Sequence, residues 1–131
     1  MKSIIKIVVV TLLGLFFNEC SMKISMTNFP EALVLEKYGD LGNLISKQII
    51  KSPDVTYELL KNLVDKEKDG WKGNFVSYKT GPYVLRSDHW VFRCYDNFAI
   101  IDTFEDGNWI SIKKNIPQLL EKLHLTPIEN K

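Results

Sequence analysis

The sequence has few of the residues from which small metal or catalytic sites are usually built. It contains two cysteines and two histidines among 131 residues. No Cys-x-x-Cys, His-x-x-x-His or His-Glu-x-x-His spacing occurs, and Asp69-Gly70-Trp71-Lys72-Gly73 lacks the order of a nucleotide-binding glycine loop. We therefore expect neither a metal site nor a cofactor.

Neither sign of charge dominates the chain. There are 17 basic and 16 acidic residues, and removing residues 1–20 takes away Lys2, Lys6 and Glu19, which leaves 15 of each. A neutral domain lacks the electrostatic attraction that dominates non-specific nucleic-acid binding. Nucleic acid is therefore not expected as a partner, and the sequence identifies no small-molecule ligand.

A hydrophobic run long enough to span a membrane is also missing from the N-terminus. The uncharged stretch from Ile7 to Phe17 has 11 residues, whereas a spanning helix needs about 20. Lys2 and Lys6 precede the stretch, and this order is typical of a signal peptide. We expect residues 1–20 to be a signal peptide or membrane anchor, and residues 21–131 to form one domain.

The residues after the apolar stretch leave the mode of attachment open. Cys20 stands where bacterial lipoproteins carry their lipid, but Phe17-Asn18-Glu19 fits neither that motif nor a small-residue cleavage site. Cys20 is thus a lipidation candidate, beside simple secretion and a retained anchor. The expected location is the periplasm, the membrane facing it, or the exterior. Cys20 and Cys94 could form a disulfide there, although we favour Cys94 as a small buried hydrophobe.

The first half of the domain predicts three helices. Pro30 and Gly39 bracket a short helix over 31–38, and three-to-four spacing of mostly apolar residues predicts a second over 41–51. Ser52 and Pro53 suit the start of a third helix. Its buried stripe is expected to comprise Leu59, Leu60, Leu63 and Val64. A C-terminal helix is predicted from Asn115 to about Thr126.

Between Trp71 and Lys114 the chain is rich in aromatic and β-branched residues, interrupted by pairs of turn residues. The predicted strands cover 74–79, 83–86, 89–95, 98–104 and 108–113. The expected fold class is α+β: N-terminal helices, a four- to five-stranded antiparallel meander, and a C-terminal helix packed as one domain.

Turn positions predict which residues share a face of this sheet. Two-residue turns at Asp96-Asn97 and Asp106-Gly107 place Cys94 opposite Ala99, and Ile101 opposite both Phe92 and Ile112. A third such turn at Ser87-Asp88 brings two more residues to that side. The resulting face is apolar and should meet the helices: Tyr83, Leu85, Trp90, Phe92, Cys94, Ala99, Ile101, Ile110 and Ile112.

The opposite face mixes aromatic and charged residues, a composition enriched at protein interfaces. The candidate partner-binding residues are Arg93, Tyr95, Phe98, Asp102, Phe104 and Trp109. Two other interpretations stay open. The last helix or the N-terminal segment could cover this face, or cross-strand aromatic pairs could serve only to stabilise the sheet.

These observations predict a non-enzymatic protein of the bacterial cell envelope that binds a protein partner, as inhibitors and immunity proteins do. That comparison rests on general plan and compartment alone. One alternative is a structural envelope lipoprotein anchored through Cys20. Another is a small hydrolase or nuclease that uses His89, which lies beside Ser87 and Asp88.

Overall fold

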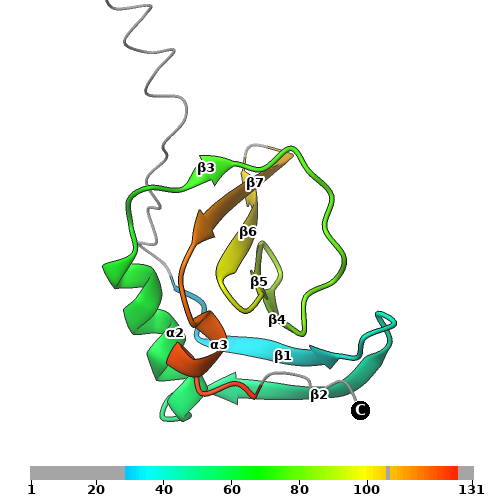
Figure 1. The fold of residues 1–131 in the computed structure, drawn as a ribbon. Helices are drawn as coiled ribbons and strands as arrows, with labels where there is room; N and C mark the ends of the chain where they lie inside the picture. The colour runs from blue at the N-terminus through cyan, green and yellow to red at the C-terminus, as the bar shows by residue number, and fades with distance from the viewer. Residues whose placement is uncertain (1–28, 106, 127–131) are drawn as a thin grey trace, which may run out of the picture.

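The computed structural model describes residues 29–105 and 107–126. There the chain forms a seven-stranded antiparallel sheet with the order β2-β1-β4-β5-β6-β7-β3 (Figure 1). The elements along the chain are β1 (Ala32–Tyr38), β2 (Leu44–Lys51), α2 (Val55–Lys66), β3 (Lys72–Gly73), β4 (Tyr83–Ser87), β5 (Trp90–Cys94), β6 (Phe98–Glu105), β7 (Asn108–Asn115) and α3 (Leu119–Lys122).

The first two predicted helices are wrong, because residues 31–38 and 41–51 hold the strands β1 and β2 instead. Leu33 and Leu35 of β1 are buried at the alternate spacing of a strand, and Ile50 is the one buried residue of β2. The apolar residues that suggested a helix over 41–51 are largely exposed. Strand β1 pairs with β2 on one side and with β4 on the other. This pairing outweighs the helix-like spacing of residues 41–51.

The predicted fold class is overturned with those helices. The described chain is mainly one seven-stranded sheet with two short helices, so an α+β domain with N-terminal helices and a four- to five-stranded meander does not fit. The predicted strand over 74–79 is also absent: only Lys72 and Gly73 pair with β7, and the chain from 74 to 82 is irregular.

The third predicted helix is present as α2. Tyr57, Leu60 and Val64 are buried, and Leu59 and Leu63 pack against the core at its margin. The predicted C-terminal helix is reduced to the four residues of α3, preceded by Gln118 in a left-handed conformation with φ 56°. The helix therefore begins at Leu119 and not at Asn115 as predicted.

The register of the central hairpins agrees with the turn analysis. Cys94 pairs with Ala99, and Ile101 pairs with both Phe92 and Ile112. The first turn differs: Ser87 pairs with Trp90, so Asp88 and His89 form the turn in place of Ser87 and Asp88. This moves the pairing of β4 by two residues, which leaves every side chain on its expected face.

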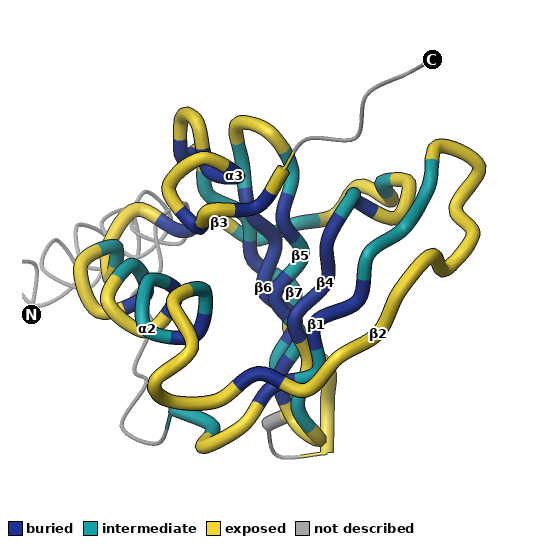
Figure 2. Tube along the Cα trace, turned by 90° about the horizontal axis from the view of Figure 1, so that it is seen from below, coloured by how far each residue is buried: buried dark blue, intermediate teal, exposed yellow. Residues whose placement is uncertain are grey.

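The core lies between one face of the sheet and the two helices. Figure 1 shows α2 and α3 on the same side of the sheet, and Figure 2 shows the buried chain concentrated in the central strands while β2 is exposed at the edge. The largest fully buried side chains of this core come from strands, helices and the connections between them: Trp71, Phe92, Leu33, Leu60, Leu85, Ile101, Ile116, Leu119, Leu120, Leu123 and Cys94.

A pair of neighbouring isoleucines tests whether residues 44–51 are a strand. Ile50 is 4% exposed and Ile49 is 71% exposed. We expect Ile50→Ala to lower the free energy of unfolding by about 2–5 kcal/mol, the usual cost of truncating a buried isoleucine. Ile49→Ala should change it by less than about 0.5 kcal/mol. Urea denaturation measures both, and a larger loss for Ile49→Ala would support the helix instead.

Candidate functional site

We call the side of the sheet that faces away from α2 and α3 the pocket face. The register and the alternation of strand side chains define it. Its residues on β1 and β4 to β7 are Ala32, Val34, Glu36, Tyr38, Val84, Arg86, Val91, Arg93, Phe98, Ile100, Asp102, Phe104, Trp109, Ser111, Lys113 and Asn115.

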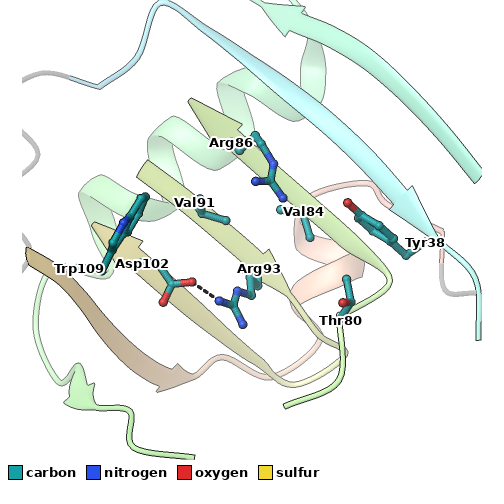
Figure 3. A pocket seen from close by; sticks show the side chains of 8 residues that line it. All are labelled: Tyr38, Thr80, Val84, Arg86, Val91, Arg93, Asp102 and Trp109. Atoms are coloured by element: carbon teal, nitrogen blue, oxygen red, sulfur yellow. Dashed lines mark ion pairs between the residues drawn. The ribbon is translucent and has the colours of Figure 1, made fainter. Parts of the chain in front are cut away.

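A pocket of about 490 Å³ opens on this face. Figure 3 shows Tyr38 and Thr80 at one end of it, Trp109 at the other, and the side chains of Arg86 and Arg93 between them. The lining is completed by Val84, Val91 and Asp102. Strands β1, β4, β5, β6 and β7 all contribute, so the pocket depends on the whole centre of the sheet.

Two ion pairs cross neighbouring strands at the pocket. Arg86 Nε lies 2.6 Å from Glu36 Oε1, and Arg93 Nη2 lies 2.5 Å from Asp102 Oδ2. The carboxylates are the deeper partners: the side chains of Glu36 and Asp102 are 8% and 11% exposed, against 46% for Arg86 and 35% for Arg93. The charged groups that solvent meets first are therefore guanidiniums.

Basic side chains extend beyond the pocket on the same face. Lys47 of β2 pairs with Glu36, and Lys72 of β3 pairs with Lys113 of β7, so these side chains share the pocket face. Among the strand residues that the structure describes, this face carries more basic than acidic groups: Lys47, Lys51, Lys72, Arg86, Arg93 and Lys113 against Glu36 and Asp102. The described strands thus give the pocket face an excess of basic side chains.

Two of the predicted partner-binding residues, Tyr95 and Phe98, are covered by the chain's own segment 74–82. Their rings stack with centroids 4.2 Å apart, and the ring of Tyr78 lies 5.3 Å from that of Phe98. Lys113 Nζ lies 4.4 Å from the Phe98 ring centroid and donates a hydrogen bond to Tyr78 Oη at 2.9 Å. These aromatic residues hold an internal segment in place.

Gly81 lets segment 74–82 approach the end of β5 closely. A Cβ atom at Gly81 would lie 2.6 Å from the carbonyl oxygen of Cys94 and 3.2 Å from the Tyr95 ring. The Tyr95 hydroxyl donates a hydrogen bond to the Lys79 carbonyl oxygen at 2.5 Å. Burial raises the pKa of Tyr95, with Arg93 opposing the shift, so the phenol keeps the proton that it donates.

The other four predicted residues lie in the open part of the pocket face. Phe104 and Trp109 pair across β6 and β7, with ring centroids 5.4 Å apart, and remain 39% and 57% exposed. Arg93 and Asp102 form the ion pair described above. The six predicted residues therefore divide into a covered aromatic pair, an exposed aromatic pair and a salt bridge.

Sequence reasoning missed the β1 side of the site. The predicted helix over 31–38 places neither Tyr38 nor Glu36 beside β4, so the partner of Arg86 could not be identified. The available signal was the apolar run Ala32-Leu33-Val34-Leu35, which is consistent with a buried strand as well as with a helix.

The remaining candidates lie away from the pocket lining. Cys94 is a fully buried free thiol on the core face, and burial raises its pKa well above the usual value, so it stays protonated. Cys20 lies outside the described residues. His89 is exposed in the β4–β5 turn and stacks on Phe104 with centroids 6.1 Å apart. Within 29–105 and 107–126, no group of three His, Cys, Asp or Glu side chains could hold a metal ion.

Comparison of the chain with protein-family models, with curated proteins and with solved structures finds no match. In the part of the chain that the structure describes, neither helix has the length and apolar character needed to cross a membrane.

Gly81 offers a test of how tightly segment 74–82 is held. We expect Gly81→Ala to lower the free energy of unfolding by about 1–3 kcal/mol, since the added methyl group meets backbone that must shift. Lys79→Ala is the control, because the Lys79 side chain is exposed and only its carbonyl oxygen accepts the bond from Tyr95. Thermal denaturation measures both, and equal stability of Gly81→Ala and the wild type would contradict the close packing.

Proposed function

We propose that this chain is a non-enzymatic protein of the cell envelope that binds a protein partner through the open part of its pocket face. The observation that carries the proposal is the exposed pair Phe104 and Trp109 beside an arginine-lined pocket. Tryptophan and arginine are enriched among residues that dominate binding energy at interfaces. Trp109 still has more than half of its surface available for burial.

The composition of the pocket favours recognition over chemistry. Its lining contains neither histidine nor cysteine, and its carboxylate is engaged by Arg93. A nucleophile activated by an adjacent base would be needed for hydrolysis. The lining instead combines guanidiniums with apolar surface, which suits a partner side chain.

The N-terminal residues support the place of action. Lys2 and Lys6 before an 11-residue apolar stretch are typical of an export signal. We propose that the domain acts in the periplasm or tethered to the membrane facing it, as an inhibitor or immunity-type protein would.

Site-specific photo-crosslinking identifies the partner and tests the face together. A photoreactive residue at Phe104 should give one crosslinked product in cells that make the chain, whereas the same residue at exposed Lys61 on α2 should give none. Mass spectrometry then names the partner. Crosslinking from Lys61 but not from Phe104 would place the interface elsewhere.

The purified partner allows a quantitative test. We expect Phe104→Ser combined with Trp109→Ser to weaken binding at least about thirtyfold, the loss typical of a hot spot. Leu41→Ser combined with Phe75→Ser is the control, because both residues are almost fully exposed but lie in segments outside the strands. The proposal is wrong if the control pair weakens binding and the aromatic pair does not.

A further inference from the structure

We infer that the pocket between Tyr38 and Trp109 binds a carboxylate of the protein partner, held by Arg86 and Arg93, with the carbon chain that carries it packed against the apolar lining. This inference rests on the proposed function and adds the chemistry that the partner must present. Both a Glu or Asp side chain and a C-terminal carboxylate have the required group.

The positions of the two arginines allow both to reach one anion. Arg86 pairs with Val91, and Arg93 pairs with Val84, so the arginines are diagonal neighbours on β4 and β5. Diagonal neighbours on one face are about 7–8 Å apart, within reach of long side chains. Figure 3 shows Arg86 and Arg93 on opposite sides of Val84 and Val91, with all four lining the pocket.

Each arginine keeps hydrogen-bond donors outside its ion pair. Arg86 donates to Glu36 through Nε and also hydrogen-bonds with Tyr38. Arg93 contacts Asp102 through Nη2 and also hydrogen-bonds with Tyr95. A guanidinium has five N–H donors and suits the planar geometry of a carboxylate. The buried acids also hold the guanidiniums in place before a ligand arrives.

Tyr38 lies at the end of the pocket and interacts with both Glu36 and Arg86. Burial and then the charge of Glu36 raise the pKa of Tyr38, with Arg86 opposing the shift. The phenol therefore remains protonated at neutral pH and adds no negative charge to the pocket. The lysines of the pocket face extend the positive field around the opening.

The same geometry favours a carboxylate over a more highly charged anion. Glu36 and Asp102 lie directly behind the guanidiniums, and their repulsion grows with the charge of the ligand. Val84, Val91 and Trp109 form apolar surface beside the arginines. A singly charged carboxylate on a short carbon chain suits both the arginines and the apolar surface, whereas phosphate suits only the arginines.

The test uses defined probes and the ¹⁵N-labelled full-length chain. The probes are acetyl-Glu-Leu-amide, acetyl-Gln-Leu with a free C-terminal carboxylate, neutral acetyl-Gln-Leu-amide, inorganic phosphate and an oligothymidylate. We expect one or both carboxylate peptides to shift the Nε–H signals of Arg86 and Arg93 and the Trp109 indole signal in a saturable way. Which peptide binds distinguishes a side chain from a C-terminus.

Variants that remove a whole ion pair avoid leaving a buried charge behind. Glu36→Gln with Arg86→Gln, and Arg93→Gln with Asp102→Asn, should each weaken carboxylate binding at least tenfold. The matched control is Asp65→Asn with Lys68→Gln, an exposed ion pair on and beside α2. This control should bind like the wild type, and amide spectra show whether each variant is folded.

Several results would overturn the inference: equal binding of the neutral peptide, tighter binding of phosphate or oligothymidylate, or unchanged binding by both pocket variants. If these occur while the crosslinked partner still depends on Phe104 and Trp109, the carboxylate inference fails and the proposed function stands. If partner binding is also unchanged by the substitution of Phe104 and Trp109, both the carboxylate inference and the proposed function fail.

Discussion

The structure depends on the register of the hairpins from β4 to β7. Because side chains alternate along a strand, a slip of one residue would place Phe92 and Ile101 on the pocket face and turn Arg93 and Asp102 into the core. Burial of the apolar face and the diagonal ion pairs therefore specify the same pairing. The pocket exists because this register brings one charged residue of each strand to a common surface.

Segment 74–82 determines how much of that surface is available. Tyr78 and Lys113 hold it over Phe98, and Gly81 lets it pass close to the end of β5. As a result, the aromatic residues near the β5–β6 turn stabilise the chain's own structure, whereas Phe104 and Trp109 at the other end remain exposed. The same segment supplies Thr80 to the pocket, so a change in the position of segment 74–82 would also change the pocket.

The turn residues made the central pairing predictable, since Asp96-Asn97 fixes Cys94 opposite Ala99 over a short distance along the chain. The Arg93–Asp102 pair follows from that hairpin. The Glu36–Arg86 pair could not be predicted in the same way, because its residues are 50 positions apart and the intervening chain contains β2 and α2. The helix predicted over residues 41–51 was wrong for a different reason. The side chains that give the helix-like spacing are ones that the edge strand β2 and the preceding turn leave exposed.

We propose that the protein partner covers the open part of the pocket face. Hydroxyl-radical footprinting of the wild-type chain, alone and with the partner identified by crosslinking, measures this directly. Exposed aromatic and aliphatic side chains are labelled in proportion to their accessibility. Phe104 and Trp109 should lose most of their labelling in the complex, while Phe75 and Leu41, which are even more exposed in the free chain, should keep theirs. Protection of Phe75 or Leu41 with unchanged labelling of Trp109 would contradict the account.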